Sequence, residues 1–281
     1  MYKAIVAYDG SPFFGWQKTV SGPSVQESLE KAIFELTQER VMPEAASRTD
    51  RGVHAEGQVV GFTTKRPCAA RGLNALLPPE IRVLHMEEVP MSFHPTLDAR
   101  GKEYHYRICS GEVQDPIHRH HSWYFRYSLD VGKMRQAAKE LLGTRDFSDY
   151  STEEKKNPIC TLTDISISEL PQNRLQIAMR GNRFLYKMAR RIAGALLHIG
   201  CGKAPGIIPE SVPNFEFGLC ETKPNQSAAL RPTTPCPKRA GRGGGSIWRG
   251  RSQSKFKVWD RFRYTAPAHG LFLHQVFYDF S

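Results

Sequence analysis

The predicted order of helices and strands is the feature that most constrains the fold of this chain. In the first half, hydrophobic spacing predicts a strand, a helix and two further strands, at residues 2–8, 25–36, 58–64 and 81–89. In the second half it predicts a similar succession, at residues 93–108, 130–142, 160–170 and 174–180. Because strand, helix and strands occur twice in this order, the sequence favours an α+β protein with two related halves.

Two helices carry clear boundary signals. Ser24, followed by a glutamate three residues later, forms a capping box and predicts a helix start. A second, strongly periodic helix is predicted from Asn182 to Gly200, with one apolar stripe. The basic residues that fall opposite this stripe are Arg183, Lys187, Arg190 and Arg191. That basic face is either solvated or turned toward an anionic groove.

The segment from Arg48 to His54 places a carboxylate among cations on a glycine-containing turn. Asp50 lies between Arg48 and Arg51, Gly52 follows, and a strand-like run begins a few residues later. The flanking cations favour the ionised form of Asp50, so its pKa is expected below the usual value. Such a cluster at the end of a sheet is a candidate reactive centre, although the same residue types also form ordinary surface turns.

The charge balance points to a polyanionic partner. The 281 residues include 39 Lys and Arg against 28 Asp and Glu, a net charge of +11. This favours nucleic acid over a membrane surface, because neither end has a basic helix with bulky apolar anchors. Much of the excess lies in residues 216–263, which hold eleven Lys and Arg against three acidic residues and lack apolar periodicity. We expect a flexible basic segment there, either an RNA-binding arm or an unstructured insertion.

The cysteine and histidine patterns do not predict a metal site. None of the six cysteines forms a Cys-x-x-Cys pair, and His118, His120 and His121 have no evident carboxylate partner. Scattered cysteines, without a secretion signal or an apolar run of transmembrane length, favour a reducing cytoplasm and no membrane.

Several short motifs, taken in order along the chain, resemble one family. The set consists of Tyr8-Asp9-Gly10, Phe14-Gly15-Trp16-Gln17, Ser24-Val25-Gln26, Arg48-Thr49-Asp50-x-Gly52-Val53-His54-Ala55, Asn74-Ala75-Leu76-Leu77-Pro78, Phe93-His94, Lys102-x-Tyr104-x-Tyr106, Asp146-Phe147, Phe184-Leu185-Tyr186-x-Met188-x-Arg190 and Ala266-Pro267-Ala268-His269-Gly270-Leu271. Each motif alone is unspecific, but the ordered set is very specific. It resembles the bacterial-type tRNA pseudouridine synthase A family over residues 2 to about 210 and 265 to 278.

The resemblance implies a fold of two pseudo-symmetric α+β domains, each ferredoxin-like or RRM-like. Their antiparallel sheets would join across a basic central cleft. The N-terminal domain would cover residues 1–100 and carry Asp50, and the C-terminal domain residues 101–281, including the flexible basic segment at about 216–263. The resemblance also implies a cytoplasmic homodimer that binds tRNA and needs no cofactor and no metal.

The activity that the resemblance implies is the isomerisation of uridine to pseudouridine in the anticodon stem-loop of tRNA, at positions 38–40 in tRNA numbering. Asp50 would act on a flipped-out uridine as nucleophile or base, and Arg190 would pair with it. Tyr104 would stack on the flipped base and is a candidate for assisting proton removal at C5. The substrate-binding set would be completed by Arg48, His54 and Lys187.

The turn around Asp50 departs from the family pattern at two positions. Ser47 and Arg51 stand where many members carry Gly and Ala. Two rival functions also stay open: a non-catalytic tRNA-binding protein, and a metal-dependent phosphohydrolase that uses Asp50 with His54. The isomerase hypothesis requires that Asp50 and its predicted partners from the second half line one pocket.

Overall fold

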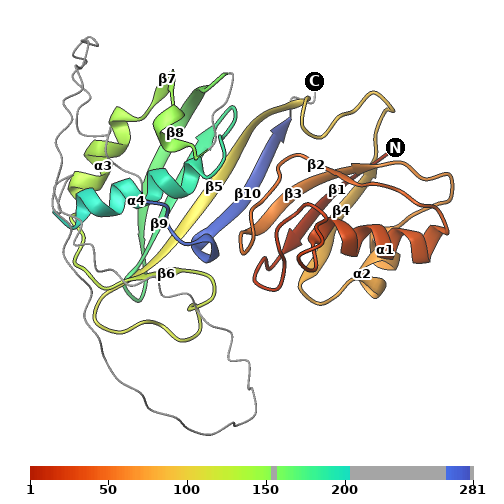
Figure 1. Cartoon of the computed structure of the whole chain (residues 1–281), viewed down its shortest axis with the longest axis horizontal. Helices are drawn as coiled ribbons and strands as arrows, with labels where there is room; N and C mark the ends of the chain where they lie inside the picture. The colour runs from red at the N-terminus through yellow and green to blue at the C-terminus, as the bar shows by residue number, and fades with distance from the viewer. Residues whose placement is uncertain (153–156, 203–263, 279–281) are drawn as a thin grey trace, which may run out of the picture.

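The computed structural model describes residues 1–152, 157–202 and 264–278, which form a mixed α+β fold around one large sheet (Figure 1). Within these residues the ten strands are β1 (Tyr2–Tyr8), β2 (Glu44–Ala45), β3 (His54–Phe62), β4 (Ile81–Glu88), β5 (Ala99–Ser110), β6 (Trp123–Phe125), β7 (Gly143–Asp146), β8 (Ile159–Leu170), β9 (Arg174–Gly181) and β10 (Leu271–Tyr278). The same part of the chain contains four α-helices: α1 (Val25–Thr37), α2 (Ala70–Leu76), α3 (Val131–Glu140) and α4 (Met188–Gly200).

The sheet is continuous and mostly antiparallel. Its order is β4-β1-β3-β10-β5-β9-β8-β7, with β2 paired to β3 and β6 paired to β5. The parallel pairs are β3 with β10 and β5 with β6. The predicted α+β class is therefore confirmed.

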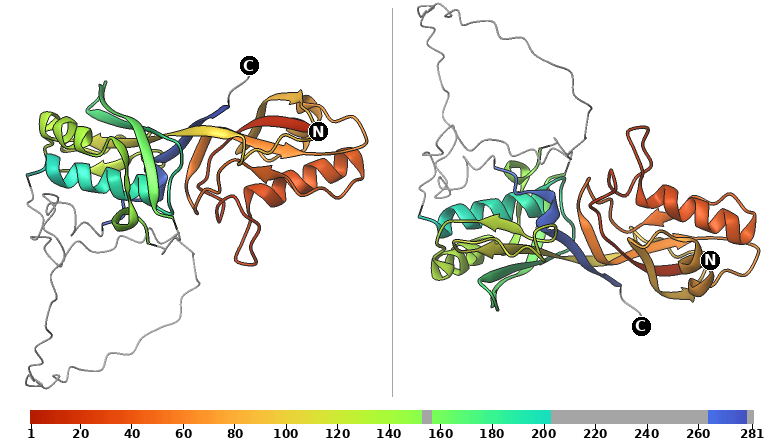
Figure 2. Two further views of the ribbon diagram at one scale, coloured as in Figure 1. Left: turned by 90° about the horizontal axis from the view of Figure 1, so that it is seen from above. Right: turned by 90° about the horizontal axis from the view of Figure 1, so that it is seen from below.

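The helices form two groups, one beside each half of the sheet. α1 and α2 lie beside the strands of the first half, and α3 and α4 beside those of the second (Figure 1). Both views of Figure 2 place α1 and α4 on the same side of the sheet. The predicted start of α1 is confirmed, since the Ser24 hydroxyl accepts a hydrogen bond from the Glu27 N–H at 3.2 Å.

α4 begins six residues later than its periodicity predicts, because Asn182 is tied to β8. The Asn182 N–H donates to the Thr161 C=O at 3.0 Å, and its side-chain oxygen accepts from the Thr161 N–H at 2.9 Å. The residues of the predicted basic face also do not share one environment. Arg191 is buried and donates to the carbonyl oxygens of Asp149 and Ser151, both at 2.8 Å, so it anchors the loop after β7 instead of meeting solvent.

Two further expectations concern the basic segment and membrane-spanning helices. The basic segment predicted at about 216–263 lies outside the described residues. None of the helices in the described ranges is long and apolar enough to cross a bilayer.

The two halves of the sheet meet where β10 lies between β3 and β5. β10 pairs with β3 in parallel and with β5 in antiparallel orientation. The backbones approach closely at Gly57 of β3, where an added Cβ would lie 2.4 Å from the backbone oxygen of His274. Only glycine leaves room for this approach, so Gly57 allows β10 to join the two halves.

Replacing Gly57 with Ala should destabilise the fold by about 2–4 kcal/mol, because the added methyl group meets backbone that cannot turn aside. Denaturant unfolding followed by circular dichroism measures the change. Gly132→Ala in the exposed first turn of α3 is the control and should change stability by less than about 1 kcal/mol. Equal stability of Gly57→Ala and the unsubstituted protein would contradict the close approach of β3 and β10.

Candidate active site

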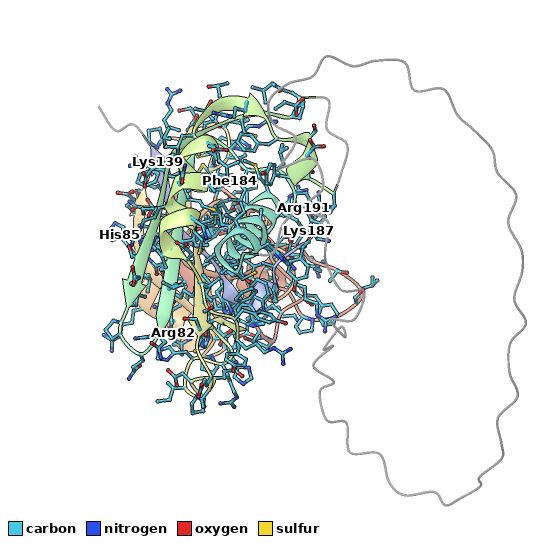
Figure 3. The ribbon with its side chains drawn as sticks, turned by 90° about the vertical axis from the view of Figure 1, so that its left-hand side faces the viewer. Arg82, His85, Lys139, Phe184, Lys187 and Arg191 are labelled. Carbon is cyan, nitrogen blue, oxygen red and sulfur yellow. The ribbon has the colours of Figure 1, made fainter. Side chains whose placement is uncertain are left out.

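A cavity of about 760 Å³ lies where the segment before β3, strand β5 and the start of α4 come together. Five of the six predicted site residues line it: Arg48, Asp50, Tyr104, Lys187 and Arg190. Figure 3, which looks along α4, shows Phe184 and Lys187, two residues of the lining, close to this helix. Residues from both halves of the sequence therefore share one cavity.

Asp50 occupies a tight turn that leads into β3. The Val53 N–H donates to the Asp50 C=O at 3.1 Å, and Gly52 adopts a positive φ of 75°, which glycine tolerates without strain. The Asp50 side chain is 24% exposed, and its Oδ2 lies 3.4 Å from Nη1 of Arg190, whose side chain is 14% exposed. This ion pair joins residues 140 positions apart. Its length is at the upper limit for a hydrogen bond, so the contact is chiefly electrostatic.

Arg190 is fixed by a second contact. It lies in the first turn of α4, and its Nε donates to the Ala266 C=O at 2.7 Å. The Ala266 N–H donates back to the Arg190 C=O at 3.2 Å. The guanidinium is thus held by the segment that leads into β10, and it faces Asp50 in a defined orientation.

Tyr104 lines the cavity from β5. It is 7% exposed, and its hydroxyl lies 2.7 Å from Oγ of Ser47. The ring meets Phe184 edge-on, with 4.8 Å between ring centres. Burial raises the pKa of Tyr104 to about 12, and the nearby Asp50 charge acts in the same direction. The phenol is therefore neutral near pH 7.

Two further cations predicted to bind substrate line the cavity, Arg48 and Lys187. Arg48 is exposed, and Lys187 is half-buried immediately before α4. Arg51, which the sequence places beside Asp50, instead stacks its guanidinium over the Phe14 ring at 4.1 Å. The cation that stands beside the carboxylate thus comes from a distant helix and not from the neighbouring position.

His54 departs from the substrate-binding position expected for it. Its side chain is 1% exposed and is not part of the cavity lining. Nδ1 accepts from the Gly10 N–H at 3.1 Å, and Nε2 lies 3.2 Å from the His269 C=O. Strand alternation accounts for this, because Val53 takes the cavity side and His54 the other. The phosphohydrolase hypothesis requires Asp50 and His54 in one site, and the structure does not place them together.

Lys102 also lines the cavity, although the sequence analysis names it only as part of a motif and predicts no role for it. Its Nζ donates to the Ala46 C=O at 2.7 Å, and burial lowers the pKa of Lys102 to about 8. Residues two apart on a strand share a face. Its position on the same face as Tyr104 was therefore predictable, and the lowered pKa was not, because burial depends on distant segments.

Two groups of histidines and carboxylates lie among the described residues. The groups are Asp9 with His54 and His121, and Glu56 with His105 and His274. His121 thus has a carboxylate partner, 3.1 Å away on Asp9, which the sequence did not reveal because 112 positions separate the two. The potential ligand atoms are already engaged, since an amide N–H donates to Nδ1 of His54 and Arg107 donates to Glu56. The contacts fit hydrogen-bonded groups better than preformed metal sites.

Known proteins resemble this chain over most of its length. A family model described as tRNA pseudouridine synthase matches residues 4–96 and 137–214. The tRNA pseudouridine synthase A 2 of Protochlamydia amoebophila (strain UWE25) is 37% identical over 98% of this chain and 93% of its own length. The tRNA pseudouridine synthase A of Geobacter sulfurreducens (strain ATCC 51573 / DSM 12127 / PCA) is 37% identical over 79% of this chain and 97% of its own length. Among solved structures, a Cbf5-Nop10-Gar1 complex superposes with a TM-score of 0.35 and 15% identity, over 70% of this chain and 45% of that chain, which is too weak to add to the assignment.

The matched segments contain the two charged residues that face each other in the cavity. Asp50 lies in the first segment and Arg190 in the second, and the ion pair joins them. Identity at this level over nearly the full length of both chains establishes common descent. The chain belongs to the tRNA pseudouridine synthase family.

Proposed function

We propose that this chain converts uridine to pseudouridine in the anticodon stem-loop of tRNA, at positions 38–40 in tRNA numbering, with Asp50 as the catalytic group. The observation that carries the proposal is the Asp50–Arg190 ion pair at the wall of a cavity that can hold a nucleobase. A base can reach such a carboxylate only after it leaves its stack. The relatives of the chain are named as tRNA pseudouridine synthases, which supports this substrate class.

The reaction is an isomerisation. The bond between uracil N1 and ribose C1′ breaks, a bond between C5 and C1′ forms, the proton on C5 leaves, and N1 gains a proton. Atoms and electrons balance without an oxidant or a reductant, so no redox cofactor is required, and the proposed steps use only groups of the protein. Asp50 acts on the ring or on the sugar as nucleophile or base. Arg190 stabilises and orients the carboxylate each time it returns to its charged form.

The remaining cavity residues bind the substrate. Tyr104 provides the ring on which the flipped uracil stacks. Arg48 and Lys187, two cations on the cavity lining, contact the phosphates of the displaced nucleotide and its neighbours. His54 receives no substrate role, because its ring lies outside this lining.

The proposal extends to the organisation of the whole chain. A domain of residues 1–100 carries Asp50, and a domain of residues 101–281 carries Tyr104 and Arg190. The tRNA binds across the boundary between them, and the enzyme acts in the cytoplasm as a homodimer. The position of β10 between β3 and β5 supports a sheet shared by both domains.

A non-catalytic tRNA-binding protein is the alternative that the same family resemblance leaves. Such a protein gains nothing from a carboxylate at the centre of a cationic cavity, because Asp50 repels phosphate. The contacts of Arg190 with the Ala266 C=O and with Asp50 hold the carboxylate at the cavity wall, where a flipped base can reach it. We therefore favour the isomerase.

Asp50→Asn should abolish pseudouridine formation and leave tRNA affinity within a few fold, since an amide can neither attack nor take up a proton. Nucleotide-resolved mapping of pseudouridine in tRNA transcripts, together with filter binding, measures both. Asp164→Asn, on the exposed face of β8, is the matched control and should retain full activity. Continued product formation by Asp50→Asn would rule out the assigned role.

Arg190→Lys should lower kcat by about 10- to 100-fold with KM within about threefold. Lysine has one nitrogen and cannot reach both the Ala266 C=O and Asp50, so the carboxylate loses its oriented partner. Steady-state kinetics on a tRNA transcript gives the two constants. Arg180→Lys, whose guanidinium lies over the Phe277 ring outside the cavity, should match the unsubstituted enzyme. Unchanged kcat in Arg190→Lys would show that the ion pair has no catalytic part.

The affinity for tRNA should fall as the pH rises through about 8, because Lys102 loses its charge there. A protonated ammonium attracts phosphate below that pH, and the neutral amine above it does not. Filter binding between pH 7 and 9 should show a loss of several fold, and Lys102→Met should remove this pH dependence and reduce the salt slope by about one. Lys139→Met, on α3, should leave both unchanged. A pH dependence that persists in Lys102→Met would assign it to another group.

A further inference from the structure

The segment Ala46–Ser47, which leads to the catalytic turn, is held by side chains from two strands. Gln58 of β3 is fully buried, and its amide nitrogen donates to the Ser47 C=O at 2.6 Å. Its amide oxygen accepts from the Ser47 N–H at 3.1 Å. Lys102 of β5 donates to the Ala46 C=O at 2.7 Å. Three hydrogen bonds thus fix the backbone of this segment and, with it, the base of the Ser47 side chain.

The Ser47 hydroxyl is the partner of the Tyr104 phenol, with 2.7 Å between the two oxygens. In the parts of the chain that the structure describes, this is the one hydrogen bond that reaches the phenol oxygen. A buried hydroxyl without a partner is unfavourable, so this contact decides where the phenol points. Phe184 constrains the same ring at its edge. The orientation of Tyr104 in the cavity therefore depends on Ser47.

We propose that Ser47 is a positioning residue for Tyr104: its hydroxyl holds the phenol oxygen, so that the tyrosine ring and not its O–H group meets the flipped uracil. This proposal rests on the function proposed above and deepens it. Tyr104 serves as a stacking surface, and the proton on C5 leaves to the Asp50 carboxylate, the group proposed above as nucleophile or base.

The state of the phenol supports a stacking role. With a pKa of about 12, roughly one Tyr104 in ten thousand is ionised at pH 8. A neutral phenol cannot accept a proton from carbon. The phenol oxygen is also already hydrogen-bonded to Oγ of Ser47. Removing the phenol O–H should consequently cost no more than removing the serine that positions it.

A double-mutant cycle tests the proposal. Ser47→Ala and Tyr104→Phe should each lower kcat about fivefold with KM within about twofold, and the double variant should fall no further than either single variant. Ser47→Thr, which keeps a hydroxyl, should stay within about twofold of the unsubstituted enzyme. Ser110→Ala removes a serine hydrogen bond on the same strand as Tyr104, away from the cavity, and should change nothing.

Three results would overturn the proposal. Losses that multiply in the double variant would show that Ser47 does not act through Tyr104. Full activity of Ser47→Ala would show that the hydroxyl is unimportant, and a loss beyond about 1,000-fold in Tyr104→Phe alone would assign proton transfer to the phenol. The melting temperature of each variant separates these results from unfolding, and Ser47→Gly repeats the test if Ser47→Ala does not fold.

A readout without catalysis separates this proposal from the proposed function. The Tyr104 ring signal in ¹³C-tyrosine-labelled protein, assigned by its loss in Tyr104→Phe, should shift in Ser47→Ala and stay in place in Ser110→Ala. If the unsubstituted enzyme forms no pseudouridine but the signal shifts, the function fails and the positioning contact stands. If pseudouridine forms and the signal does not shift, the positioning contact fails alone.

Discussion

The ion pair between Asp50 and Arg190 makes the strictest demand on the rest of the structure. Its partners are 140 positions apart, and 3.4 Å separates their nearest polar atoms. The two halves of the sheet must therefore be held in a fixed position relative to each other. Strand β10 holds them, because it pairs with both β3 and β5. Arg190 also donates a hydrogen bond to the Ala266 C=O, in the segment just before β10. A slip of one residue in this pairing moves a strand by about 3.3 Å, enough to separate the charges. The join in the sheet thus sets the distance between the two charges as well as the stability of the fold.

A buried polar network behind the turn supports the carboxylate from the other side. The Tyr8 hydroxyl lies 2.7 Å from Oγ1 of Thr49, and Gln58 donates to the Tyr8 oxygen at 3.3 Å while it also holds the backbone of Ser47. These groups flank Asp50 on its N-terminal side. A satisfied network in a low-dielectric interior favours one arrangement strongly, because every alternative leaves a buried polar atom without a partner. The turn that carries the Asp50 carboxylate is consequently preorganised.

The sequence predicts what local signals determine and misses what distant contacts determine. The α+β class and the start of α1 follow from hydrophobic period and a capping residue, and both are confirmed. The start of α4 was wrong because hydrogen bonds from Asn182 to a strand outweigh helical periodicity there. His54 was expected at the substrate, but the residue before it takes the cavity side. The motif singles out Asp50 as a reactive residue, yet its physical partner, Arg190, follows only from family resemblance or from the fold.

The cavity also resolves a difficulty about charge. Most of the excess positive charge in the sequence lies in residues 216–263, outside the described residues, so it cannot explain how a carboxylate coexists with a polyanionic substrate. The lining itself supplies the answer. It carries four basic side chains, Arg48, Lys102, Lys187 and Arg190, against two acidic ones, Glu44 and Asp50. At physiological salt, exposed charges act over about 8 Å, so these neighbours dominate the potential that a phosphate meets. The Asp50 carboxylate is thus tolerated because the basic side chains that line the same cavity outnumber the acidic ones.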